Sequence, residues 1–474
     1  MRSGRLSLVS VAWLGACTTQ VVDDSHAGPD AFVPFAASGE RIEHWGWTAS
    51  GVGVHVETRD SELGVACSFV RAEDGELRCV PAGLFGLAKL FTDASCSEAG
   101  ALYFDPALEP CAGPAAIGQL VEGDMGDGCE GAVWVADALA EAEPPAEVYW
   151  PDGMGGCAPT GSPPIGPYYA PTRIDPSALV RGERVEELAD NGVGVAVIVG
   201  DDGSRLVVGP ADSRFAGAGA RVEALVQPAG LRLVPEVVAR PSVVFSPECG
   251  AEPIYEVAEC VFEQLGAVID EGRAYTPGPV VAYEDIEAGG CSEFAPDSMP
   301  GIVHVRAGEP LADDALTELE PEVLEPSEGE GVSARVLRTA TGERLFADEA
   351  PFEADGALCT PWQTVERPVC LSDYAEPIAP WPYFADAACT APVVIDTGEN
   401  GLLGPGDVVW EPAASACGSS SPVIAAIWRV GGLESGPVFF QSDLGCVEET
   451  LAEGWFPLEP IELGSLPSLT YGRL

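Results

Sequence analysis

The chain has 474 residues, with 75 acidic and 23 basic side chains, so its formal net charge is −52. A charge this negative repels phosphate backbones and anionic lipid, which excludes a nucleic-acid-binding protein and unaided docking on an acidic membrane. Because 46% of the residues are hydrophobic, the chain can bury sizeable cores and is not a disordered acidic protein.

Residues 1–16 are typical of a secretory signal peptide. Arg2 and Arg5 precede an apolar run, LSLVSVAWL, that is too short to span a bilayer. The run ends in Leu14-Gly15-Ala16-Cys17, which resembles the lipobox of bacterial lipoproteins. The resemblance implies that Cys17 is acylated and becomes the first residue of the mature chain.

Residues 17–38 are then expected to be the lipidated cysteine and a polar tether. In Gram-negative lipoproteins, Asp after the cysteine often retains the protein at the inner membrane, and this chain has Thr18 there. The resemblance therefore implies a lipid anchor in the outer membrane, on its periplasmic or surface face.

The 15 cysteines also indicate export. Without Cys17 an even number remains, and exported chains use such cysteines as structural disulfides. Zinc is the rival explanation, but the sequence has no C-x-x-C pair and no cysteine cluster with a nearby histidine. We therefore predict disulfides, no metal site and no cofactor.

Three markers recur in the same order and predict three related modules. The first is RCVP, RLVP and RPVCL, at 78–81, 232–235 and 367–371. The second is Phe, a short gap and a cysteine, ending at Cys96, Cys249 and Cys389. The third has an aromatic residue before a cysteine, ending at Cys157, Cys291 and Cys417. We place the modules at 39–181, 182–330 and 331–474, with an acidic flexible linker, 313–331, before the third.

Within a module the pattern predicts strands. Val- and Ile-rich runs alternate with turns, and EDGE at 73–76 and DDGS at 201–204 are hairpin signals. Helical periodicity is weak, and 42 prolines argue against long helices. We predict an all-β, disulfide-stapled protein made of antiparallel meanders. The modules form either a closed β-propeller-like ring or three tandem β-domains.

The repeats reduce the number of possible disulfide pairings. Cys67 and Cys79 bracket a hairpin in the first module, and Cys359 and Cys370 do so in the third. In the second module Leu233 stands at the place of Cys79. The partner place, near Leu225 and Val226, also lacks a cysteine. Both cysteines are thus missing together, as expected if they bond only to each other.

We predict the bonds Cys67–Cys79 and Cys359–Cys370, with Cys96–Cys111 and Cys249–Cys260 as further equivalents. The sequence leaves open the partners of six cysteines, namely Cys129, Cys157, Cys291, Cys389, Cys417 and Cys446.

Two stretches of the first module carry a family resemblance. SELGVACSFVRAEDGELRCVP at 61–81, followed by LFTDASCSEAG at 90–100, resembles a group of secreted, cysteine-bearing bacterial lipoproteins of unknown function. The resemblance implies a secreted lipoprotein and supplies no activity and no catalytic residue.

Catalytic motifs give no positive assignment. Asp396-Thr397-Gly398 resembles the loop of aspartic proteases, but that chemistry needs a second such Asp, and no other D-T-G or D-S-G exists. The P-loop, H-E-x-x-H and G-x-S-x-G patterns are absent. His55 and His304 lie in alternating strand runs, where a lone histidine is typically structural.

Aromatic residues recur at one place in each module, at Trp150, Tyr283 and Trp410. They could be platforms that stack on a carbohydrate or core anchors of the modules, and we favour core anchors.

These patterns predict an exported, membrane-anchored envelope lipoprotein that acts as a non-enzymatic structural or binding module. Its expected partners are the membrane, through the N-terminal lipid, and an unknown protein or glycan ligand. The alternative is a secreted hydrolase whose active site is not readable from motifs.

Overall fold

A computed structural model describes most of the chain from residue 36 onward. The described residues are 36–82, 87–91, 94–96, 99–104, 115–122, 133–145, 147–151, 157–159, 167–215, 220–227, 229–241, 254–258, 262, 265–280, 302–325, 331–346, 352–372, 376–377, 383–395, 404–413, 423–442, 445–449 and 454–474. They form β-strands and short 3-10 turns, with no α-helix among them, which confirms the all-β prediction.

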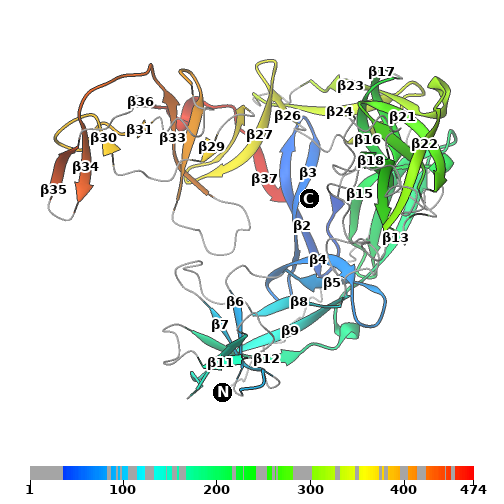
Figure 1. The fold of residues 1–474 in the computed structure, drawn as a ribbon, viewed down its shortest axis with the longest axis horizontal. Helices are drawn as coiled ribbons and strands as arrows, with labels where there is room; N and C mark the ends of the chain where they lie inside the picture. Colours follow the sequence, from blue (N-terminus) through cyan, green and yellow to red (C-terminus); the bar gives the residue numbers. More distant parts are fainter. Residues whose placement is uncertain are drawn as a thin grey trace, which may run out of the picture.

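The first sheet has nine strands and contains both the first and the last strand described (Figure 1). Across the sheet the strands are β1 (Ala36–Ala37), β15 (Arg205–Asp212), β14 (Val193–Gly200), β13 (Arg181–Leu188), β5 (Leu77–Pro81), β4 (Val65–Arg71), β3 (Val52–Asp60), β2 (Ile42–Ala49) and β37 (Thr470–Arg473). The predicted D-G hairpins are present as the β4–β5 and β14–β15 pairs. Gly75 and Gly203 supply the positive φ that their turns require.

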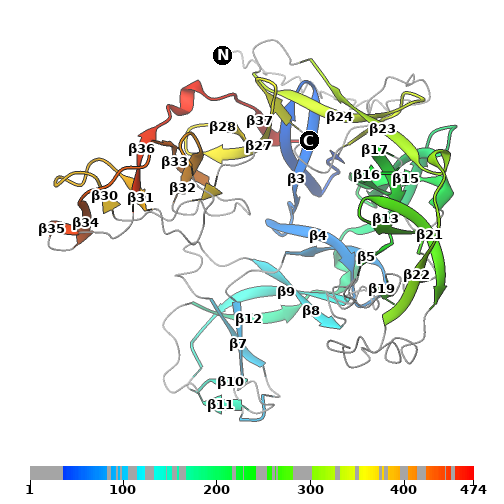
Figure 2. The same cartoon turned by 45° about the horizontal axis from the view of Figure 1, so that its top comes forward.

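A second, seven-stranded sheet forms a lobe between β5 and β13 (Figure 2). Its strands are β11 (Cys157–Pro159), β10 (Tyr149–Pro151), β6 (Leu87–Phe91), β7 (Ala99–Phe104), β12 (Tyr168–Arg173), β9 (Val133–Ala142) and β8 (Ala116–Glu122). A small closed barrel is inserted in the same way between β17 and β23. It contains β18 (Val238–Pro241), β19 (Ile254–Ala258), β22 (Ile302–Pro310), β21 (Arg273–Val280) and β20 (Ala267–Asp270).

The largest sheet has thirteen strands. Its main path is β16 (Ala220–Val226), β17 (Ala229–Pro235), β23 (Thr317–Val323), β24 (Ser333–Thr339), β26 (Phe352–Ala354), β27 (Ala357–Thr364), β33 (Val423–Val430), β32 (Val408–Pro412) and β29 (Glu376–Pro377). Four strands branch from it: β25 (Arg344–Phe346), β28 (Pro368–Ser372), β31 (Val393–Ile395) and β36 (Trp455–Pro460). A three-stranded sheet, far from β37 in Figure 1, contains β30 (Tyr383–Phe384), β34 (Val438–Ser442) and β35 (Gly445–Glu449).

The lobe and the barrel each end in a 3-10 turn, after which the chain returns to the long sheets, and a third such return turn follows β36. The turns are η2 (Pro176–Ala178), η7 (Asp313–Ala315) and η8 (Leu463–Ser465); a fourth, η3 (Ser213–Phe215), follows β15. The strand after η2, β13, pairs with β5 behind it and β14 ahead. Likewise β23 pairs with β17 and β24. After η8, Ser468 bridges Val369 of β28, and β37 pairs with β2.

This continuous pairing is incompatible with a propeller, in which each blade is a separate sheet around a central channel. Because β13 and β23 each hydrogen-bond to strands on both sides, the sheets run on from one meander into the next. The propeller alternative is therefore wrong for the part of the chain that the structure describes.

The expected flexible linker is also corrected. From 313 to 323 it is not a linker but the turn η7 and the strand β23. Leu316 and Leu319 are 4% and 3% exposed, while the Glu318 side chain is 60% exposed. Leu319 packs in the cluster that contains Leu233. Leu319, between Glu318 and Glu320, thus ties this acidic strand to the core.

Strand register also corrects one equivalence between modules. Cys79 faces Phe69, two residues after Cys67. Leu233 faces Val222, so in the predicted alignment of the modules Cys67 corresponds to Ala220 and not to Leu225 or Val226. The β16–β17 ladder has no register shift along the hairpin. Ala220, the position that corresponds to Cys67, therefore lies at the end of the hairpin away from its turn. Ala220 and Leu233 are both buried in one cluster.

Candidate functional site

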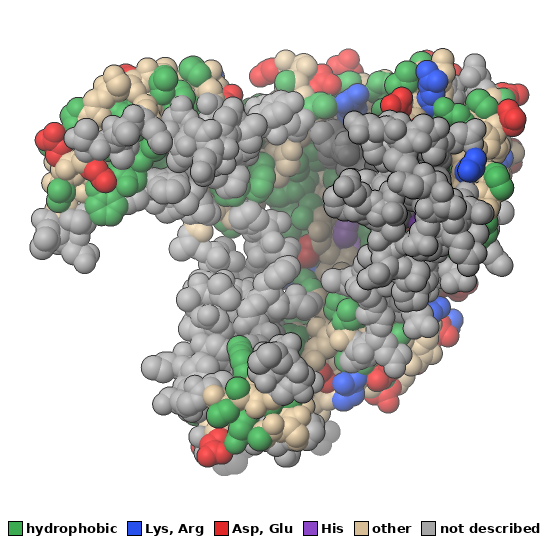
Figure 3. All heavy atoms as spheres, viewed as in Figure 1, with side chains coloured by type: hydrophobic (Ala, Val, Ile, Leu, Met, Phe, Trp, Pro, Cys, Tyr) green, Lys and Arg blue, Asp and Glu red, His purple; other side chains and the backbone are tan. Residues whose placement is uncertain are grey.

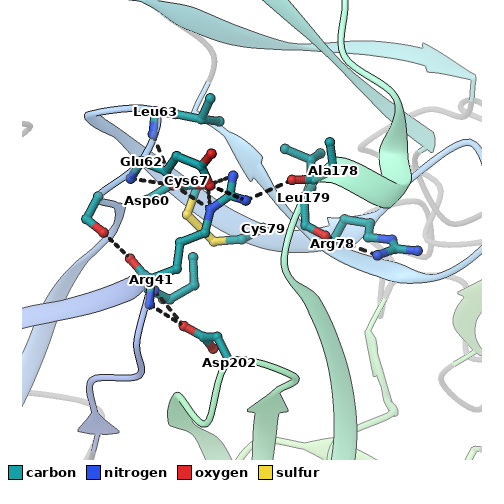
Figure 4. A network of polar contacts seen from close by, with 12 residues as sticks. Arg41, Asp60, Glu62, Leu63, Cys67, Arg78, Cys79, Ala178, Leu179 and Asp202 are labelled. Carbon is teal, nitrogen blue, oxygen red and sulfur yellow. Dashed lines mark hydrogen bonds and ion pairs between the residues drawn. A yellow bond between two sulfur atoms is a disulfide. The ribbon is translucent and has the colours of Figure 1, made fainter.

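Arg41, just before β2, joins parts of the chain that are far apart in sequence (Figure 4). Its Nε and Nη2 donate to Asp60 at 2.9 and 2.6 Å, and Nη1 donates to the Ala178 carbonyl in η2 at 2.9 Å. The Asp60 side chain is fully buried, and it also accepts the backbone N–H groups of Glu62 and Leu63. The hydrogen bonds from Arg41 to Asp60 raise the pKa of Arg41, against the effect of burial. Both oxygens of Asp60 are engaged by donors of the protein itself.

Asp202, in the β14–β15 turn, holds the backbone on the other side of Arg41 (Figure 4). Its Oδ2 accepts the N–H groups of Arg41 and Ile42 at 3.0 and 2.6 Å, and its Oδ1 accepts that of Ser204 at 3.1 Å. Burial raises the pKa of Asp202, but the hydrogen bonds outweigh it and hold the pKa below its usual range. A side chain at Gly39 would begin 2.5 Å from Asp202 Oδ2, so the close approach requires glycine.

A second buried carboxylate repeats this arrangement at the end of β15. Asp212 is ion-paired with Arg214 and accepts the Thr317 hydroxyl at 3.0 Å. Arg214 Nη1 donates to the carbonyls of Asp314 and Ala315 in η7 at 3.4 and 3.1 Å. Burial raises the pKa of Asp212, but the hydrogen bonds and charge of Arg214 and the hydroxyl of Thr317 together lower it by more.

A third arginine binds the remaining return turn. Nη2 of Arg367 donates to the carbonyls of Leu463, Gly464 and Leu466 at 3.0, 2.9 and 2.8 Å. Arg41, Arg214 and Arg367, called the anchor arginines below, thus each bind carbonyls of a different return turn. The last carbonyls of a helical turn commonly lack an intrahelical partner, so a guanidinium is a suitable donor at that place.

A fully buried histidine, His44, and a half-buried one, His55, share one hydroxyl in the β2–β3 pair. His44 Nδ1 lies 3.0 Å from Thr58 Oγ1, and His55 Nε2 lies 2.8 Å from the same atom. Burial lowers the pKa of both histidines to about 4, and the neighbouring charge of His55 lowers that of His44 further. A hydroxyl nucleophile and its general base need such a hydroxyl–imidazole hydrogen bond. Thr58, however, is only 5% exposed, so a substrate has little access to its hydroxyl.

The disulfides confirm two predicted bonds and correct a third. Cys67 is bonded to Cys79 and Cys359 to Cys370, with Cα atoms 5.3 and 5.4 Å apart. Cys96 is bonded to Cys157 and not to Cys111, because the lobe brings the turn after β6 and the start of β11, 61 residues apart, to a Cα separation of 5.8 Å. The structure also joins Cys389 to Cys446, at 6.0 Å. The other predicted site residues, Cys17, Cys111, Cys249 and Cys260, lie outside the described residues.

The recurring aromatic residues do not share one environment. Trp410 is 4% exposed and packs on Trp362 with ring centroids 4.9 Å apart, which confirms it as a core anchor. Trp150 is 37% exposed on β10, so the core prediction is wrong there. Tyr283 lies outside the described residues, as does Asp396.

Many of the described arginines pair with carboxylates. Arginine and acidic side chains lie beside one another over the strands at the right of Figure 3. Arg181 pairs with Glu76, and Arg205 pairs with Glu187. Among the described residues no three His, Cys, Asp or Glu side chains are grouped to hold a metal ion. No helix there is long and apolar enough to cross a membrane.

The anchor arginines were not predicted from the sequence. Their carbonyl partners lie about 100 or more residues away, and a hydrogen bond to a backbone carbonyl leaves no mark in residue identity. The D-S-R pattern at 212–214 is the one local signal that pointed to an ion pair.

Comparison with known proteins gives one match. A family model described as a family of unknown function, DUF7481, matches residues 33–271, from before β1 to the turn after β20. No curated protein and no solved structure matches the chain.

Proposed function

The chain belongs to DUF7481, a family of unknown function, and we propose that it is an exported envelope lipoprotein anchored through Cys17. In this proposal the disulfide-stapled β-scaffold is a non-enzymatic structural or binding module held at the outer membrane. The sequence Leu14-Gly15-Ala16-Cys17 supplies the anchor.

The cysteines carry the proposal. All eight cysteines in the part that the structure describes are in disulfides. Structural disulfides form and persist in oxidising compartments and are rare in the cytosol. Export explains this pairing, and a lipobox explains how an exported chain of this composition stays at the membrane.

The use of buried polar groups favours a structural or binding role over hydrolysis. Asp60 and Asp212 are each engaged by an arginine that also binds a return turn. His44 and His55 are hydrogen-bonded to Thr58 inside a strand pair. These are the groups that acid–base chemistry would draw on, and here they connect elements of the fold.

We also propose that 39–181, 182–330 and 331–474 are copies of one module. Two similarities support this: a hairpin with a cystine or its Ala220–Leu233 counterpart, and a return turn bound by an anchor arginine. Replacing the Cys67–Cys79 pair by Ala and Leu, as at Ala220 and Leu233, tests the equivalence.

The ligand is proposed to be a protein or a glycan without dense negative charge. The net charge of −52 repels polyanions at physiological salt. Salt-sensitive binding of the purified protein to heparin would contradict this part of the proposal.

The anchor is tested by replacing the acylated residue. Cys17→Ser removes the acceptor sulfur, and Thr18→Ser is the matched control next to it. We expect the wild type and the control in the detergent-rich phase of a partition assay and Cys17→Ser in the aqueous phase. Equal partitioning of all three would refute the lipid anchor.

A further inference from the structure

The hydroxyl of Thr58 can serve both histidines only in one arrangement of protons. His55 makes a backbone hydrogen bond with Glu57 that favours its protonated form, so the ring donates there, through the nitrogen that does not face Thr58. His55 Nε2 then accepts the Thr58 hydroxyl proton. Thr58 Oγ1 in turn accepts Nδ1–H of His44. The chain of donors is complete with both rings neutral.

A second proton on His44 has no acceptor in this cluster, and one on His55 disrupts the hydrogen bonds of Thr58. His44 is fully buried, and its Nε2 has no hydrogen-bond partner. Protonation there would bury an N–H donor and a positive charge without an acceptor. Protonation of His55 at Nε2 would turn that nitrogen into a donor, so the Thr58 hydroxyl would have to rotate its proton away and accept from both rings, which places two positive or donating rings at one oxygen.

The same histidine holds the last strand. The His44 carbonyl accepts the N–H of Leu474 at 2.8 Å, and its N–H donates to Ser38 Oγ at 2.9 Å. Ser38 in turn donates through its N–H and its hydroxyl to the Leu474 carbonyl. Next to this, Trp47 of β2 packs on Tyr471 of β37 with centroids 4.6 Å apart. A displacement of His44 therefore acts directly on the β2–β37 pairing.

Charges from the surrounding elements do not offset the cost of protonation. From the β14–β15 turn, Asp202 favours a charged His44, but burial and His55 outweigh it, and the pKa of His44 is about 4. On β3, Glu57 is paired with Arg59 at 3.0 Å, and Tyr471 of β37 faces this pair. Two further charged groups at this junction also form an ion pair, Glu43 of β2 and Arg473 of β37.

We propose that His44, Thr58 and His55 form an acid-sensitive clasp, which holds β37 against β2 at neutral pH and releases it on acidification. The folded junction binds fewer protons than the open one between pH 6.5 and 4. Closure is therefore fully favoured above about pH 6.5 and is lost as the pH falls toward 4.

Peptide-resolved hydrogen exchange at pH 7 and pH 4, corrected for the intrinsic rate, tests the clasp. We expect peptides covering 36–60 and 466–474 to exchange about tenfold faster or more at pH 4, with 302–310 in the barrel unchanged. The variant His44→Asn with His55→Gln keeps an amide near each bonded nitrogen and cannot titrate. It should lose the acid response, and His304→Gln in β22 should keep it.

An acid response that persists in the double variant would overturn the proposal, and so would simultaneous opening of every peptide in the wild type. If the double variant does not fold, the histidine resonances of the wild type decide. Two of them should titrate near pH 4 together with the opening, whereas titration of both near 6.5 would contradict the clasp.

Discussion

At the scale of single residues, arginine binds a carboxylate and a backbone carbonyl at the same time, which lysine cannot do in this geometry. The guanidinium of Arg41 binds both oxygens of Asp60 and still has a donor for the Ala178 carbonyl. A lysine ammonium is a point charge without this fork. The sequence has 23 basic residues, of which only Lys89 is a lysine. The preference for arginine is evident from the sequence. The contacts that these arginines make are not, because their partners lie far away along the chain.

Removing one partner of the Arg41–Asp60 pair should be costly. Arg41→Met keeps the length of the side chain but leaves Asp60, whose side chain is fully buried, without its counter-charge. We expect the free energy of unfolding to fall by about 3 kcal/mol, as for other broken buried pairs. The measurement is denaturant unfolding at pH 7.

Arg181→Met is the matched control. Its pair with Glu76 spans 2.9 Å, but the two side chains are 50% and 46% exposed. The control should cost less than about 1 kcal/mol. Equal losses in the two variants would show that Arg41 does not hold a buried charge in solution.

At the scale of elements, hairpins were predictable and their inserted neighbours were not. The D-G turns fixed the β4–β5 and β14–β15 pairs because a turn acts on residues adjacent in sequence. β23 was taken for a linker because its charge outweighed its alternation, although Leu319 is buried. The Cys96–Cys157 bond was missed because the lobe, and not a hairpin, sets that distance.

The hairpin cystines and the Ala220–Leu233 pair should be interchangeable if the modules are copies. Cys67→Ala with Cys79→Leu should fold, with a loss of about 3 kcal/mol in unfolding free energy from the lost cross-link. Cys67→Ala with Cys79→Ala is the control and should lose about 2 kcal/mol more, because it leaves buried volume unfilled. The comparison uses thermal and denaturant unfolding of both variants.

The equivalence would be wrong if the Ala–Leu variant were no more stable than the Ala–Ala variant. That result would mean that the Leu233 side chain fills a space that the first module does not have.

At the scale of the whole molecule, the long sheets depend on pairings that no local pattern reveals. β37 pairs with β2 from the other end of the described chain, and β13 and β23 pair across inserted segments. Sequence repeats indicate related modules but not how their strands pair. The repeats alone are therefore compatible with a propeller, whereas the strand pairings are not. The candidate site also depends on distant residues, since Arg41 contacts Asp60, Ala178 and Asp202, which lie in separate segments of the chain.

The proposed function rests on the acylated cysteine, so the most direct measurement is the mass of the N-terminal peptide of the protein isolated from membranes. The account predicts that trypsin releases a peptide from Cys17 to Arg41 that carries acyl chains on Cys17. A mature chain that begins elsewhere, or an unmodified Cys17, would contradict it.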